Sequence, residues 1–120
     1  MSIQSLAKRV VELCNQGKNF DVMNTMYAPD IISVEPTGKA TAGKAEVIEK
    51  SKKWAATVTI HGETVIGPFF HGPDQFATKT IFDITRNATG KRMQIEEISV
   101  YTVKNDLITK EQFFFDGENW

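Results

Sequence analysis

The spacing of apolar residues changes from a helical period to a two-residue period near residue 57. This change constrains the fold more than any other feature of the sequence. Before it, apolar side chains recur every three or four residues, as on the buried face of a helix, over residues 3–14, 20–27 and 43–55. After it, apolar and polar residues alternate as in strands, over residues 58–71, 75–86, 91–103 and 107–115. Short turns between long strands predict antiparallel neighbours.

Capping and breaking residues set the expected boundaries of these elements. Ser2 can cap the first helix and Gly17 can end it in a left-handed conformation. Pro29 is expected to end the second helix, because its ring lacks an N–H donor. A short strand is predicted over residues 31–34, followed by a loop before the third helix. Gly62 and the pair Gly67-Pro68 predict bends within the first long strand.

The order of these elements predicts an α+β fold in a single domain that spans residues 1–120. Three N-terminal helices would pack on a strongly curved, mixed or antiparallel sheet and enclose a pocket. The length of 120 residues suits one domain with its own core. The chain shows no linker, internal repeat or low-complexity segment that would divide it.

Both faces of the predicted sheet carry apolar residues. In residues 75–86, Phe76, Phe82 and Ile84 share one face while Ala77 and Ile81 share the other. Helices can cover only one face, and a solvated outer face would be polar. We therefore expect a homodimer that packs through the outer sheet face.

Composition narrows the partners and the compartment. The formal net charge is −1, which gives no electrostatic signature for nucleic acid or anionic membrane. The single cysteine, Cys14, cannot form an internal disulfide and is expected to be buried and inert. The first residues lack the apolar run of a signal peptide, and no run is long enough to span a bilayer. The expectation is a soluble cytoplasmic protein.

Several fragments, taken in order, resemble the cone-shaped nuclear transport factor 2-like superfamily, which includes ketosteroid isomerase and the SnoaL-like polyketide cyclases. The resemblance covers nearly the whole chain and implies the cone fold with a pocket. Fold does not fix function, because this superfamily hosts enzymes, binders and transport adaptors. The fragments are YAPD (27–30), VEPTG (34–38), GKA (43–45), EISVY (97–101) and ITKEQFFFD (108–116).

Two glutamates are the main catalytic candidates. The resemblance matches Glu35, just before a proline, to the isomerase's catalytic carboxylate base, which is an aspartate there. Glu97 shares a face with Met93, Ile95 and Tyr101, where a bare charge is costly, so it should be paired, hydrogen-bonded or protonated. It also aligns with the isomerase acid that donates a hydrogen bond to the developing oxyanion. Each also has a structural interpretation, since Glu35 could pair with Lys39 or Lys44 and Glu97 could be satisfied within the core.

Further candidates surround these acids. Tyr101 is a possible hydrogen-bond donor and His71 a weak acid–base candidate at a strand end. Two isolated histidines do not make a metal site, so no metal and no cofactor are expected. Where the isomerase has a first-helix tyrosine this chain has Val10 or Val11, so steroid isomerase activity is not expected. The expected ligand-binding residues are Met23, Tyr27, Trp54, Phe82, Ile84, Ile95, Lys110 and Phe114.

Three functions remain open at this point. The first is an isomerase or cyclase that moves a proton on a small apolar carbonyl compound without a cofactor, with Glu35 as base and Glu97 as donor. The second is a non-catalytic protein that binds an apolar small molecule. The third is a dimeric interaction module with a filled cone. An epoxide hydrolase ranks low, because no arginine is placed between acids in this sequence.

Overall fold

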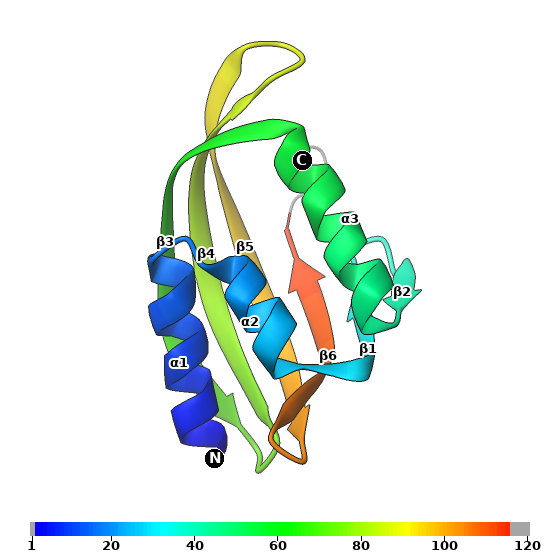
Figure 1. Ribbon diagram of the computed structural model, residues 1–120. Helices are drawn as coiled ribbons and strands as arrows, with labels where there is room; N and C mark the ends of the chain where they lie inside the picture. The colour runs from blue at the N-terminus through cyan, green and yellow to red at the C-terminus, as the bar shows by residue number, and fades with distance from the viewer. Residues whose placement is uncertain (1, 116–120) are drawn as a thin grey trace.

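Two-residue alternation over the second half of the chain produces one strongly curved sheet, and the three helices lie on its concave side (Figure 1). The computed structural model describes residues 2–115. The helices are α1 (Ile3–Asn15), α2 (Asn19–Met26) and α3 (Lys44–Ala56). The strands are β1 (Tyr27–Val34), β2 (Ala40–Ala42), β3 (Val58–His71), β4 (Gln75–Arg86), β5 (Lys91–Lys104) and β6 (Leu107–Phe114). The α+β class is therefore confirmed.

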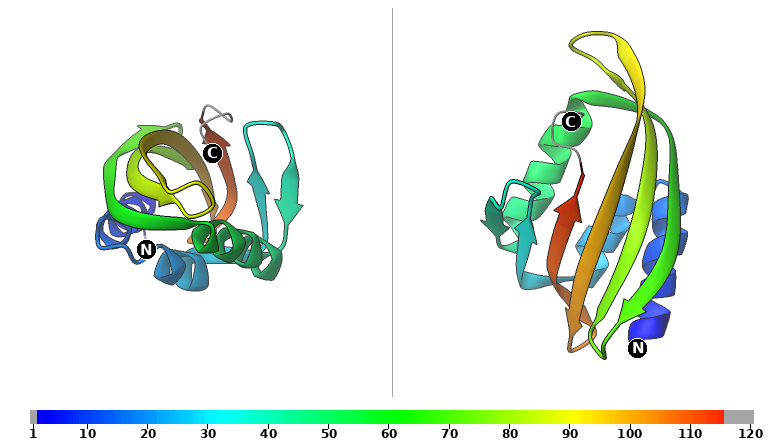
Figure 2. Two further views of the ribbon diagram at one scale, coloured as in Figure 1. Left: turned by 90° about the horizontal axis from the view of Figure 1, so that it is seen from above. Right: turned by 180° about the vertical axis from the view of Figure 1, so that it is seen from behind.

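The sheet is mixed and open. Its strand order is β2-β1-β6-β5-β4-β3, and all neighbours are antiparallel except β1 and β6, which run parallel. Seen from above, the sheet wraps around one side of the helices without closing into a barrel (Figure 2). None of the helices in the described part of the chain is both long and apolar enough to cross a membrane.

The start of β1 departs from the sequence expectation. The second helix ends at Met26 rather than near Pro29, and Tyr27 is the first residue of a strand. Pro29 disfavours helical conformation at Ala28, and Tyr27 before it pairs with Ile108 of β6. Pro29 lies inside a break in the β1–β6 register between Tyr27 and Ile32, where its missing donor costs no ladder bond. Residues 40–42, expected as part of a loop, form the short strand β2.

Strand β3 bends where its glycines are. The pairing with β4 shifts between Ile60 and Gly62 and again between Ile66 and Phe69, as the sequence predicted. Helix α1 caps this edge strand through Asn15. Its side-chain amide donates to the Val65 carbonyl at 3.1 Å, and its amide oxygen accepts from the Val65 N–H at 2.8 Å. This pair of bonds satisfies an exposed sheet edge and fixes α1 against it.

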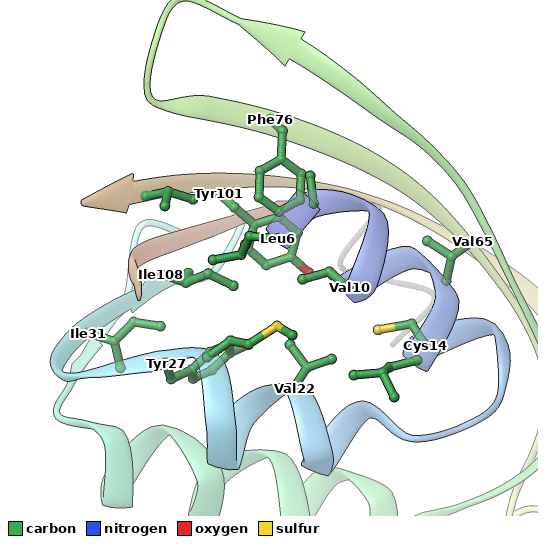
Figure 3. Close-up of a cluster of buried hydrophobic side chains, with 14 of the residues drawn as sticks. Leu6, Val10, Cys14, Val22, Tyr27, Ile31, Val65, Phe76, Tyr101 and Ile108 are labelled. Carbon is green, nitrogen blue, oxygen red and sulfur yellow. The ribbon is translucent and has the colours of Figure 1, made fainter. Parts of the chain in front are cut away.

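The main core fills the space between α1, α2 and the sheet (Figure 3). Leu6 and Val10 of α1 are each 1% exposed, and Phe76 of β4 is fully buried. Tyr101 stacks on Phe76 with ring centroids 4.9 Å apart. A second, smaller cluster contains Val58, Phe82, Ile84 and Ile95, with Trp54 packed against it. These two clusters leave a hollow between them.

The outer face of the sheet remains apolar and exposed. Figure 2, seen from behind, shows the strands in front of the helices. One row of paired residues crosses this face from β6 to β3. It consists of Phe114, Ile98, Lys79 and Ile66. The fractional exposures of the outer side chains Ile66, Phe69, Ile98 and Phe114 range from 40% to 56%. Nothing within residues 2–115 covers this face.

Candidate functional site

A cavity of about 550 Å³ lies between the helices and the concave face of the sheet. All three helices and five of the six strands contribute to its lining. Alternation along β4 and β5 turns Thr78, Thr80, Glu97 and Ser99 toward it, so this part of the sheet forms a polar floor. Helices α1, α2 and α3 supply a mostly apolar roof. The size suits a small organic molecule.

Glu97 sits in this floor. In the ladder it lies opposite Thr80, and the Ser99 hydroxyl donates to its Oε1 atom at 3.2 Å. The pKa of Glu97 is raised to about 8, chiefly by burial; the Ser99 hydrogen bond lowers it, the charges of Glu111 and Glu63 raise it, and Lys50 lowers it. The carboxyl group is therefore mainly protonated at neutral pH and can donate a hydrogen bond.

Glu111 anchors a second polar group at the β1–β6 end of the cavity. It is 1% exposed, its Oε1 atom accepts from the Tyr27 hydroxyl, and its Oε2 atom accepts from the Ser33 hydroxyl at 2.7 Å. Burial raises the pKa of Glu111, while the hydrogen bonds from Tyr27 and Ser33 and the charge of Lys50 lower it. Burial and the nearby Glu111 also raise the pKa of Tyr27 well above its ordinary value. Both hydroxyls thus donate to Glu111.

Lys50 connects this group to Glu35. Its ammonium donates to the Ser33 hydroxyl oxygen at 2.7 Å and lies 3.6 Å from Oε1 of Glu35. It also lies 5.7 Å from the centre of the Phe113 ring. Glu35 follows β1 directly, in a turn where its N–H donates to the Lys39 carbonyl at 2.9 Å. Its ionic partner is therefore on α3, and not Lys39 or Lys44.

A fourth carboxyl group, Glu63, enters the cavity from β3. Asn19 at the start of α2 donates to its Oε2 atom at 2.8 Å. Burial raises the pKa of Glu63 to about 6, although the hydrogen bond from Asn19 lowers it. At neutral pH most of this group is ionised, whereas most of Glu97 is not. The floor of the cavity therefore holds two acids in different protonation states.

The roof and walls are apolar and aromatic. Met23 and Phe20 of α2 face the cavity together with Trp54 of α3, whose ring lies 5.6 Å from that of Phe82. The Cys14 thiol of α1 also faces it, and burial raises the pKa of this thiol to about 12. The thiol therefore stays protonated and does not act as a nucleophile.

The structure brings most of the predicted site residues to one lining. These are Met23, Tyr27, Glu35, Trp54, Phe82, Glu97 and Tyr101. Ile84 and Ile95 lie instead in the small core cluster that supports Trp54 and Phe82 from behind. They fill packed space and do not contact the cavity.

Three predicted residues lie elsewhere. Lys110 and Phe114 point to the outer face of the sheet, because the β5–β6 register shifts between Thr102 and Val103 and reverses the expected facing of β6. His71 is exposed at the end of β3, where its Nδ1 atom lies 3.1 Å from the Gln75 side chain. It does not line the cavity.

Sequence reasoning missed Lys50, Glu63 and Glu111. The same register shift hid Glu111, which alternation counted from Phe114 assigns to the outer face. The bend at Gly62 obscured the facing of Glu63. Lys50 lies among charged residues of α3, a pattern typical of a water-facing side, but its long side chain extends back to Ser33.

The comparisons with known proteins agree with this fold. A SnoaL-like domain model matches residues 1–115. A candidate SnoaL-like polyketide cyclase from Mesorhizobium loti is 40% identical, with 95% of this chain and 99% of that chain covered and a TM-score of 0.88. No protein of curated function matches this sequence.

More distant structures share the architecture alone. A candidate SnoaL-like polyketide cyclase from Jannaschia sp. CCS1 is 12% identical, with 96% of this chain and 85% of that chain covered and a TM-score of 0.79. A nuclear transport factor 2-like protein of unknown function from Cytophaga hutchinsonii is 15% identical, with 96% of this chain and 100% of that chain covered and a TM-score of 0.75. Together with the domain match, these likenesses confirm the resemblance that the sequence carries. The chain belongs to the SnoaL-like domain family within the nuclear transport factor 2-like fold.

Proposed function

We propose that this protein binds a small carbonyl compound with an apolar body and transfers a proton to or from carbon without a cofactor. The observation that carries the proposal is the contrast between two acids on one lining. Glu35 is ion-paired to Lys50, and Glu97 is mainly protonated at neutral pH. A carboxylate and a carboxylic acid in one apolar cavity are the base and the acid that enolisation requires.

In the proposed reaction, Glu35 removes a proton from the carbon next to the carbonyl group. The carbonyl oxygen gains negative charge, and the Glu97 carboxyl group stabilises it by donating a hydrogen bond. Return of the proton to another carbon gives an isomer. Attack of the enolate carbon on a second carbonyl carbon of the same molecule gives a ring, and the proton then goes to the new alkoxide. The name of the Mesorhizobium loti relative, a candidate polyketide cyclase, is compatible with the second course.

Exchange of α-protons into deuterated water tests this step without knowledge of the natural product. A panel of cyclic ketones and diketones is incubated with the protein and followed by NMR. We expect exchange to fall by about a hundredfold or more in both Glu35→Gln and Glu97→Gln, the usual contribution of a general acid or base. Glu96→Gln is the matched control, because Glu96 precedes Glu97 on β5 but is exposed. Unchanged exchange in both site variants would rule out the assignment.

The main alternative is binding without chemistry. It is favoured by Val10, which lines the cavity where the isomerase resemblance calls for a tyrosine donor. A pure binding protein would change Trp54 fluorescence on adding a ketone and leave its α-protons unexchanged. Exchange that depends on Glu35 would exclude this alternative.

A further inference from the structure

The ionisable groups on the cavity lining are strongly unbalanced in sign. Among the described residues, four carboxyl groups face the cavity, from Glu35, Glu63, Glu97 and Glu111, against the single ammonium of Lys50. That ammonium is already held by Glu35 at 3.6 Å and by the Ser33 hydroxyl at 2.7 Å. His61 lies at the rim, where its Nε2 atom is 2.7 Å from the Thr85 hydroxyl. Glu97 is mainly protonated at neutral pH, so the excess negative charge at that pH is carried by Glu63, whose described hydrogen-bond partner is the neutral amide of Asn19.

One of these carboxyl groups also has hydrogen-bonding capacity in reserve. Ser99 is the one hydrogen-bond partner of Glu97 in the described part of the chain, and it contacts Oε1 alone. The other oxygen, Oε2, remains available to a ligand in the cavity. Because the carboxyl group is half-buried in the cavity floor, an attractive contact there is screened less than one on the outer surface.

The aromatic walls of the cavity suit a positively charged ligand, as the carboxyl groups do. Aromatic rings line the cavity from several elements, namely Phe20, Tyr27, Trp54, Phe82, Tyr101 and Phe113. The face of an aromatic ring carries partial negative charge and attracts cations, and quaternary ammonium groups are commonly bound by such rings. Aliphatic parts of Met23, Val22 and Ala55 complete an apolar surface.

Other ligand classes fit less well. An anion would meet excess negative charge in a medium of low dielectric constant. A neutral apolar molecule would remove water from the acids and return no compensating interaction. A metal ion needs several convergent ligands, and no three His, Cys, Asp or Glu side chains among residues 2–115 are arranged to hold one.

We propose that the cavity selects an organic cation, a compound whose apolar body carries a protonated or quaternary amine held among Glu63, Glu97, Glu111 and the aromatic walls. This inference rests on the proposed function only in taking the cavity as the ligand site.

Binding of a cation is then linked to proton release. The groups that act on Glu97 are Ser99 on its own strand, Glu111 on β6, Glu63 on β3 and Lys50 on α3. Cys14 on α1 and Tyr101 on β5 also face it, and its charge acts on both of them. A cation beside them favours the ionised carboxylates, so it lowers the pKa of Glu97 from about 8 and that of Glu63 from about 6. Affinity for a permanent cation must therefore rise as the pH rises through this range.

Calorimetric titration with two molecules of the same shape tests the inference. Phenyltrimethylammonium carries a charge that does not titrate, and tert-butylbenzene is its neutral counterpart. We expect the cation to bind about tenfold or more tightly at pH 9 than at pH 6, since one unit of pKa shift corresponds to tenfold in affinity. At pH 7, two buffers of different ionisation enthalpy should reveal proton release for the cation and none for the neutral compound.

Variants assign the effect to the site. Glu97→Gln should flatten the pH dependence for the cation, whereas the matched change Glu96→Gln on the outer face should leave it intact. The inference is overturned if the neutral compound binds as tightly as the cation at pH 9, if the affinity for the cation does not change with pH, or if neither compound binds. Ketone exchange without cation preference would overturn this inference alone. Cation preference without exchange would overturn only the proposed chemistry.

Discussion

Two adjacent glutamates on β5 show how strongly the face of a sheet determines the chemistry of a side chain. Glu96 points outward and is exposed, with its Oε2 atom 3.6 Å from the Lys79 ammonium. Glu97 points inward, where burial raises its pKa to about 8. The two residues have the same side chain and nearly the same sequence position. The raised pKa of Glu97 comes from the inward environment that alternation gives it.

The same contrast extends over the whole sheet. On the inner side polar groups are satisfied, and among residues 2–115 no buried side-chain nitrogen or oxygen atom lacks a hydrogen-bond partner. On the outer side, Phe69 and Phe114 are about half exposed. The inner face thus has hydrogen-bonded polar groups that line the cavity. The outer face has exposed apolar side chains, which are typical of a surface that another molecule covers.

Truncating an aromatic ring on each face should give the largest difference. We expect Phe76→Ala to lower the free energy of unfolding by about 3–5 kcal/mol, because this fully buried ring leaves a cavity beside Tyr101. Phe114→Ala should change it by about 0.5 kcal/mol or less. Urea denaturation, at a concentration where size-exclusion chromatography gives a monomer, measures both. Equal losses would contradict the assignment of the two faces.

Removing a carboxyl group from each face should give the next largest difference. Glu111→Ala leaves the hydroxyls of Tyr27 and Ser33 without their acceptor, so we expect a loss of about 3 kcal/mol in unfolding free energy. Glu96→Ala, which breaks only an exposed ion pair, should cost about 0.5 kcal/mol or less. Urea denaturation again provides the measurement. A Glu111 variant as stable as the Glu96 variant would show that the buried network adds no stability.

The sequence predicts the faces of β4 and β5 because alternation in them is unbroken. Every second residue of β4 from Phe76 to Ile84 is buried, and the same frame in β5 brings Glu97 and Tyr101 inside. Counting by two therefore suffices to identify an inward acid on β5. The pocket-lining role of Trp54 was equally accessible, from its place on the helical stripe.

The rest depended on features that a two-residue count cannot detect. In β6, Ile108 and Glu111 both face inward although they are an odd number of residues apart, because the pairing with β5 slips between Thr102 and Val103. That slip moved Lys110 out of the predicted site and Glu111 into it. The parallel pairing of β1 with β6 brings together Ser33 and Glu111, which are distant in sequence. Neither local spacing nor composition predicts such a contact.

The pH dependence of stability should sharpen the contrast between Glu96 and Glu97. Glu97 keeps its proton to about pH 8 in the folded state but loses it near pH 4.5 when unfolded. Between these values the unfolded state binds fewer protons, so the free energy of unfolding falls as pH rises and levels off above about pH 8. Glu97→Gln cannot ionise and should therefore be more stable than the parent protein at pH 9, by about 2 kcal/mol or more, and nearly equal at pH 4.

Urea denaturation of both proteins at pH 4, 7 and 9 measures this difference. Glu96→Gln serves as the control and should follow the parent protein throughout, because its carboxyl group is exposed. If the difference in unfolding free energy between Glu97→Gln and the parent protein is the same at all three pH values, the inward carboxyl group is ionised in the folded state at neutral pH. The proposed donor would then be lost.

The smallest effect on the stability of the single chain, and the clearest on assembly, is expected from a charge on the outer face. Ile98 is 40% exposed and lies opposite Phe114, at the centre of the uncovered apolar surface. We expect a second copy of the chain to cover this surface, because two copies related by a two-fold axis bury the same patch on each subunit. Ile98→Glu would place two carboxylates in that contact and should convert a dimer to a monomer. Its effect on the unfolding of the separated chain should be below about 1 kcal/mol.

Light scattering coupled to size-exclusion chromatography distinguishes the two states. Gln94→Lys provides a matched control, because Gln94 is exposed on the same strand but opposite Asp83, which attracts the added charge. If the parent protein and the control are both monomeric, the outer face has no partner copy. If Ile98→Glu remains dimeric, the copies meet through another surface. In either case the lining of the cavity is unaffected, because Ile98 and Glu97 point to opposite sides of the same strand.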